Sequence, residues 1–64
     1  MSLKTWRSVT KMLPPENAPV LALPIDEEYP YIAAWDGEIW YEYHTSQPLH
    51  NIGWWMFYPF NPND

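Results

Sequence analysis

Proline spacing limits this chain of 64 residues to short elements of secondary structure. Its eight prolines stand at positions 14, 15, 19, 24, 30, 48, 59 and 62. Because proline lacks a backbone N–H and clashes with the preceding helical turn, each one ends or excludes a long helix. The longest proline-free stretch after Pro30 covers 31–47, where Ile, Tyr and Trp outnumber good helix formers. The spacing predicts a mostly β protein with little helix.

The clearest local signal is the dipeptide Asp36-Gly37, which lies between two segments rich in aromatic residues. Such a dipeptide is typical of a two-residue type I′ hairpin turn, because both residues tolerate positive φ. This register pairs Trp35 with Glu38. Both faces of the hairpin are then largely apolar, so the sequence leaves open which face belongs to the core. One face carries Tyr31, Ala33, Trp35, Trp40 and Glu42, and the other carries Ile32, Ala34, Ile39, Tyr41 and Tyr43.

Three further segments complete the predicted sheet. Residues 20–23 (Val-Leu-Ala-Leu) lie between two prolines and predict a short buried strand. Residues 52–58 predict the last strand. Residues 5–13 fit either a short edge strand or a helical turn that ends before Pro14.

The rest of the chain is predicted to form loops, chiefly the acidic segment 24–30 and the segment 45–51. We therefore expect a single small domain over 1–64, with an ordered part of about 5–60. Its predicted fold is a three- to four-stranded antiparallel sheet with a central Asp-Gly hairpin, long Pro-rich loops and little helix.

Small size makes the hydrophobic core marginal, because a domain of about 60 residues buries only about 60% of its unfolded surface. The chain has no cysteine that could add a disulfide or a thiolate zinc site. Five Trp, five Tyr and two Phe can supply dense packing instead. About two or three Trp would fill such a core, since each ring can bury about 150–250 Å². The other rings either thicken the core or lie on a surface that meets another molecule.

Charge is distributed unevenly along the chain. All three basic residues precede Met12, whereas all eight acidic residues follow it, and the net charge is −5. A surface of this sign repels phosphate backbones, so we expect no direct contact with nucleic acid. It would attract a basic surface, including the nucleic-acid channel of another protein. The alternative is that the acidic residues serve only solubility, the commoner role of such a charge.

No arrangement of residues predicts catalysis, a cofactor or a metal. The two glycines are too few for a phosphate-binding loop, and the serines lack the setting of a nucleophile. His44 and His50 lack metal-ligand spacing. Glu38 and Glu42 would share a strand face about 13 Å apart, beyond the usual separation of a glycosidase pair. We therefore expect no enzyme, no cofactor and no metal site.

Targeting signals are also missing from the pattern. The first residues lack the apolar run of a signal peptide. No stretch approaches the ~20 apolar residues that a membrane-spanning helix needs. The sequence therefore predicts a cytoplasmic protein without membrane contact.

Four short motifs follow one another along the chain. They are W-x-x-V-x-x-x-L-P at 6–14, a V-L strand at 20–23, an aromatic-D-G turn leading to Trp at 35–40, and a Trp-Met pair with following prolines at 53–62. In this order they resemble a family of small domains of unknown function, family 551, which is frequent in phage and prophage open reading frames. The T-H that usually precedes the Trp-Met pair is Gly-Trp here. The resemblance implies a phage or prophage accessory protein in the cytoplasm of a bacterial host, and no particular activity.

Within these motifs we expect most apolar side chains to pack in the core rather than to touch a ligand. The predicted core residues are Trp6, Val9, Leu13, Trp40, Trp55 and Met56.

The hypothesis that best joins these observations is an accessory protein that binds a host or phage protein. It could inhibit a basic or nucleic-acid-handling partner. The alternatives are a self-associating structural module such as a homodimer, and a shallow aromatic patch for a small ligand or carbohydrate. The candidate partner-binding residues are Asp26, Glu27, Glu28, Trp35, Glu38, Trp40, Glu42 and Trp54.

Overall fold

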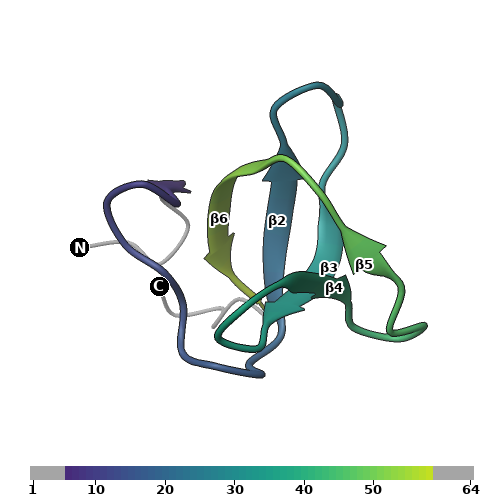
Figure 1. The fold of residues 1–64 in the computed structure, drawn as a ribbon. Helices are drawn as coiled ribbons and strands as arrows, with labels where there is room; N and C mark the ends of the chain where they lie inside the picture. The colour runs from purple at the N-terminus through teal and green to yellow at the C-terminus, as the bar shows by residue number, and fades with distance from the viewer. Residues whose placement is uncertain (1–5, 59–64) are drawn as a thin grey trace.

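A computed structural model describes residues 6–58 and shows one sheet of antiparallel strands (Figure 1). The six strands are β1 (Arg7–Ser8), β2 (Val20–Pro24), β3 (Tyr31–Trp35), β4 (Trp40–Glu42), β5 (Pro48–Leu49) and β6 (Ile52–Phe57). Their order in the sheet is β1-β6-β2-β3-β4-β5. The described residues contain no helix, so the predicted mostly β class is confirmed. The prediction of three to four strands was too low.

The extra strands are the two short ones at the sheet edges. β1 pairs with β6 and is followed by a turn, in which the Lys11 and Met12 N–H groups donate to the Ser8 carbonyl oxygen. Of the two alternatives for residues 5–13, the short edge strand is present at Arg7–Ser8, and a hydrogen-bonded turn rather than a helix follows it at residues 9–11. Residue 5 lies outside the described residues. β5 pairs with β4 inside the segment that was predicted to be a loop. Its Pro48 is tolerated because an edge strand does not need every N–H group.

The β3–β4 register differs from the predicted one. Trp35 lies opposite Trp40 rather than Glu38, and residues 36–39 form a four-residue loop. Within that loop only Gly37 has positive φ, at 101°. The prediction of a two-residue type I′ turn is therefore wrong. The Asp36 carboxylate explains the wider loop, because it accepts hydrogen bonds from the backbone N–H groups of residues 38 and 39, each at 2.8 Å.

The change of register spans two residues, so each side chain keeps its predicted face. The structure identifies the inner face. Ala33 and Trp40 belong to the buried cluster, and Trp35 packs against it. The Trp35 and Trp40 ring centroids lie 5.7 Å apart.

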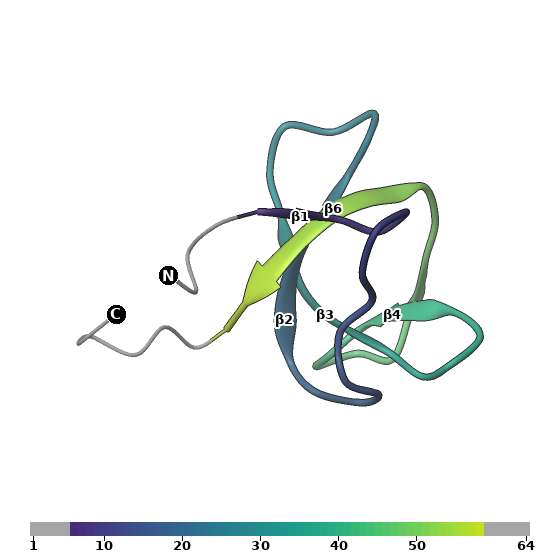
Figure 2. The same cartoon turned by 90° about the vertical axis from the view of Figure 1, so that its left-hand side faces the viewer.

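The sheet is curled (Figures 1 and 2), and one buried cluster joins side chains from strands that are not neighbours in it. Trp40 of β4 and Trp55 of β6 belong to one buried cluster, although two strands separate β4 from β6 in the sheet. Small residues of β2 and β3 lie between them and make room for the rings. The full cluster is Val20, Ala22, Ala33, Trp40, Ile52 and Trp55.

Trp55 is the centre of this core and is fully buried. Its ring meets Phe57 edge to face, with centroids 5.0 Å apart. The Arg7 guanidinium lies 5.5 Å from the Trp55 ring centroid and 5.1 Å from that of Phe57. The Trp55 indole N–H donates to the Met12 carbonyl oxygen at 2.8 Å, which ties the segment after β1 to β6.

The predicted core is confirmed in part. Trp40, Trp55 and Met56 are buried, and Val9 packs against the cluster. The prediction is wrong for Trp6 and Leu13, which are 40% and 46% exposed. Trp6 precedes the edge strand β1, and Leu13 follows the turn at residues 9–11, so neither is enclosed by neighbouring strands.

Ser46 carries local backbone strain. It adopts φ 63°, in the left-handed region that Gly and, to a lesser extent, Asn tolerate but most other residues do not. We expect Ser46→Gly to raise the free energy of unfolding by about 0.5–1 kcal/mol, measured by urea unfolding. Asn51→Gly is the matched control, because Asn51 has φ 61° but tolerates it better. A Ser46→Gly gain no larger than the Asn51→Gly gain would contradict this explanation.

Candidate functional site

The structure divides the predicted partner-binding residues between interior and surface. Trp40 is only 7% exposed and belongs to the core, so its side chain offers little area to a partner. Trp35 is half-buried beside it. Both rings face inward because they share the inner face of the β3–β4 pair. The acidic residues Asp26, Glu27, Glu28 and Glu38 are exposed, Glu42 is half-buried, and Trp54 is exposed.

The outer face of the sheet is apolar across its three central strands. Because side chains alternate along a strand, the residues between the inward-facing ones of β2 and β6 point outward. The register places Leu21 opposite both Met56 and Ile32, and Leu23 opposite Trp54. We call this surface the outer face and define it by Leu21, Leu23, Ile32 and Trp54. Met56 lies on the same side of β6 but is buried.

An apolar hollow of about 300 Å³ opens on this face. Trp6, Leu23 and Trp54 line it. Leu23 and Trp54 are cross-strand partners, and Trp6 reaches the same place because β1 pairs with β6 through Ser8 and Trp54. Trp54 is 41% exposed and Trp6 is 40% exposed, so two indole rings face the surface at one point. We refer to this place as the apolar hollow.

An acidic loop, defined by residues 25–30, joins β2 to β3 (Figure 1). It begins two residues after Leu23, which lines the apolar hollow. Its first residue, Ile25, is 63% exposed and donates its backbone N–H to the Asn51 carbonyl oxygen at 2.8 Å. The Ile25 side chain lies over Gly53, where an added Cβ would stand 2.4 Å from the Ile25 Cγ2. These contacts fix the start of the acidic loop against β6, beside Trp54.

One carboxylate of the acidic loop is held by a side-chain contact. The Tyr31 hydroxyl donates to Glu27 Oε1 at 2.6 Å. This hydrogen bond raises the pKa of Tyr31 above its ordinary value. The contact anchors the end of the loop to the first residue of β3.

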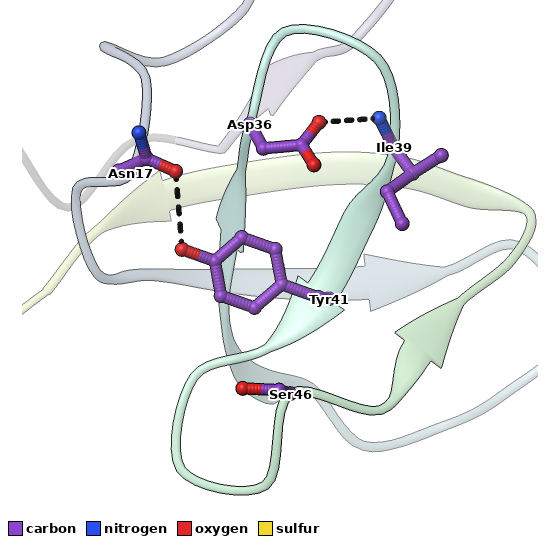
Figure 3. A pocket seen from close by; sticks show the side chains of 5 residues that line it. All are labelled: Asn17, Asp36, Ile39, Tyr41 and Ser46. Atoms are coloured by element: carbon purple, nitrogen blue, oxygen red, sulfur yellow. Dashed lines mark hydrogen bonds between the residues drawn. The ribbon is translucent and has the colours of Figure 1, made fainter.

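A second hollow, polar and about 360 Å³ in volume, lies toward the opposite end of β2 (Figure 3). The Tyr41 hydroxyl donates to Asn17 Oδ1 at 3.2 Å across it. We call it the polar pocket. Sequence patterns did not predict this pocket, because its residues come from three loops and one strand. They are Asn17, Asp36, Ile39, Tyr41 and Ser46.

Asp36 links the polar pocket to the stability of the β3–β4 loop. Its hydrogen bonds from the backbone N–H groups of Ile39 and Glu38 lower the pKa of its carboxyl group. A lowered folded-state pKa stabilises the fold above the unfolded-state value of about 3.9, and this contribution is lost as the pH falls through the folded-state value.

We therefore expect Asp36→Asn to lower the unfolding temperature at pH 7. The difference in unfolding temperature from the wild type should narrow as the pH falls from about 4 through the lowered folded-state pKa, because the Asp36 carboxylate is then progressively protonated. Thermal unfolding followed by circular dichroism at several pH values measures this difference. A difference in unfolding temperature that stays constant down to acid pH would show that the charge of Asp36 does not contribute to stability.

The described residues offer few other sites. Among residues 6–58, no three His, Cys, Asp or Glu side chains are grouped so that they could hold a metal ion. The same part of the chain has no helix long and apolar enough to cross a membrane. His44 lies edge to face with Tyr43, with ring centroids 5.6 Å apart.

Comparisons with protein-family models, with curated proteins and with solved structures found no match. The resemblance to family 551 therefore stays a prediction.

Proposed function

We propose that this chain is a non-enzymatic accessory protein that binds another protein through its outer face. The observation that supports the proposal is the apolar hollow, where Trp6 and Trp54 expose two rings beside Leu23. Tryptophan is enriched at the centres of protein interfaces and often dominates their binding energy. Exposing two such rings at one place is costly for a monomer unless a partner covers them.

The charge of the chain supports a basic partner. No Lys or Arg follows Lys11, whereas eight acidic residues do. Such a surface attracts proteins with basic surfaces, and these include proteins that handle nucleic acid. Together with the motif resemblance, this charge supports an accessory protein of phage or prophage type. Such a protein would bind a basic partner in the bacterial cytoplasm and so inhibit it.

The polar pocket favours a second candidate function, the binding of a small polar ligand such as a sugar. It offers the Tyr41 ring together with the polar groups of Asn17, Asp36 and Ser46. A few convergent polar groups around an apolar wall are typical of ligand sites. Titration with a panel of sugars, followed by NMR of the Tyr41 and Ile39 signals, tests this candidate. Shifts of those signals that saturate would support it, and an unchanged spectrum would reject it.

Capture from a bacterial lysate, read by mass spectrometry, tests the protein-binding function. Three immobilised chains are compared: the wild type, Trp54→Ala and Ile39→Ala. Ile39 is a matched control, because it is 49% exposed but lines the polar pocket instead of the apolar hollow. We expect one protein to be retained by the wild type and Ile39→Ala and lost by Trp54→Ala. A protein lost by Ile39→Ala but kept by Trp54→Ala would assign binding to the polar pocket instead.

A further inference from the structure

We infer that the apolar hollow receives one apolar side chain from a basic segment of the partner, while Lys or Arg residues flanking that side chain pair with the acidic loop. The inference rests on the proposed function and adds the chemistry of the partner. It joins two features that lie side by side, one apolar and one acidic.

The size of the apolar hollow favours a single side chain as its occupant. At about 300 Å³ it lies at the lower end of the range for ligand pockets, which runs from about 300 to 1,000 Å³. Its walls are two indole rings and a leucine side chain, with no charged group among them. An aliphatic or aromatic side chain can fill such a space, whereas a charged group would lose its hydration there without a partner.

Charge complementarity determines what should flank that side chain. Asp26, Glu27 and Glu28 are all exposed. Asp26 follows Leu23 by three residues, so its backbone lies within about 10 Å of a wall of the apolar hollow. That distance is close to the Debye length of about 8 Å at physiological salt, so these carboxylates still attract cations near the apolar hollow.

The carboxylates of the acidic loop face solvent, since Asp26, Glu27 and Glu28 are all exposed. An incoming cation can therefore approach them. An extended segment advances about 3.3 Å per residue, so a Lys or Arg within about three residues of the apolar side chain can reach the loop.

The same charge argues against a second copy of this chain as the occupant. A two-fold dimer brings identical surfaces together. Two copies joined at the apolar hollow would therefore bring two acidic loops close to one interface. Like charges that lie close together at an interface disfavour association, whereas a basic segment would pair with the acidic loop.

Three fluorescein-labelled peptides test the inference by fluorescence anisotropy with the full chain. The first is Gly-Lys-Lys-Gly-Leu-Gly-Lys-Lys-Gly, the second replaces its Leu with Gly, and the third replaces its Lys residues with Glu. We expect the first to bind at least about tenfold more tightly than either of the others, since both the anchor and the charges contribute. Raising the salt from about 0.05 to 0.5 M should weaken its binding, because exposed ion pairs are screened.

Protein variants locate the two contributions. Neutralising the acidic loop, by Asp26→Asn, Glu27→Gln and Glu28→Gln together, should weaken binding of the first peptide about tenfold and reduce its salt dependence. Trp54→Ala should weaken binding of the first peptide about tenfold and leave the salt dependence of that binding unchanged. Glu16→Gln is the control, because Glu16 is an exposed acid beside Gly37 of the β3–β4 loop and is not among the candidate partner-binding residues. It should change the affinity less than twofold.

Three results would overturn the inference. They are equal binding of the Lys and Glu peptides, an effect of Glu16→Gln as large as that of the acidic-loop variant, and Trp54 signals that change with protein concentration in the absence of peptide. The third result would assign the apolar hollow to a second copy. If a lysate protein is lost on Trp54→Ala but none of the peptides binds, the inference fails and the proposed function stands. If the peptides bind as expected but capture is indifferent to Trp54, the proposed function fails.

Discussion

Replacing Trp55 with alanine is expected to leave the chain largely unfolded at room temperature. Trp55 is fully buried and packs on Phe57, and Arg7 stacks on both rings. Truncating a buried Trp to Ala costs about 3–5 kcal/mol, from lost burial and from the cavity that remains. A single core in a domain of this size rarely supplies more than about 3–5 kcal/mol in total. The loss therefore equals most or all of the stability.

Two further variants separate packing from hydrogen bonding at this position. Trp55→Phe keeps an aromatic ring but removes the indole N–H that donates to the Met12 carbonyl oxygen. It should destabilise the fold less than Trp55→Ala. Trp54→Ala, at the neighbouring exposed position, should cost about 1 kcal/mol or less, because the ring is only partly buried in the free chain. Urea unfolding followed by far-UV circular dichroism measures all three, and similar losses for residues 54 and 55 would contradict the assignment of inner and outer faces.

The second large effect is expected on binding. Trp54→Ala should weaken the affinity for the captured partner at least about 30-fold, which corresponds to about 2 kcal/mol. The reason is that Trp54 forms a wall of the apolar hollow and crosses to Leu23, so its removal opens the site that the partner is proposed to fill. Isothermal titration calorimetry with the purified partner gives the dissociation constant directly.

The control for this effect must hold the fold and the exposed area constant. Ile39→Ala removes a similarly exposed apolar side chain at the polar pocket and should leave the affinity within about threefold, as expected for a residue outside the interface. Circular dichroism spectra of both variants should match the wild type. An equal loss of affinity in the two variants would point to a general effect of apolar surface rather than to the apolar hollow.

Local sequence patterns sufficed for the parts of the fold that depend on neighbouring residues. The segment 20–23 is framed by prolines and forms β2, and the apolar run at 52–58 contains β6. The two faces of the β3–β4 pair were also predicted correctly, because face depends only on alternation. The edge strands β1 and β5 are two residues long, which is too short to produce a periodic pattern.

The errors arose where a side chain or a distant segment decides the geometry. The turn propensity of Asp-Gly predicted a two-residue turn, but the Asp36 carboxylate binds two backbone N–H groups and holds a four-residue loop. Trp40 was placed both in the predicted core and among the candidate partner-binding residues, and the structure places it with Trp55 in one buried cluster. Propensity cannot reveal such tertiary choices.

The candidate site was predictable only in its components. Trp54 and the acidic residues 26–28 were identified from composition and charge. The apolar hollow itself also needs Trp6, which lies far from Trp54 in sequence and meets it only through the β1–β6 pairing. Trp6 had been predicted to lie in the core because the sequence does not show this pairing. No local pattern states that an edge strand will bring these two rings together.

NMR of the five Trp indole N–H signals in the complex with the captured partner tests the central claim most directly. Trp55 serves as an internal reference, because its indole N–H is bonded to the Met12 carbonyl oxygen inside the fold. We predict that the Trp6 and Trp54 signals shift or broaden when the partner is added, while the Trp55 signal stays in place. Unchanged Trp6 and Trp54 signals, with shifts at the polar pocket instead, would contradict the assignment of the outer face as the binding surface.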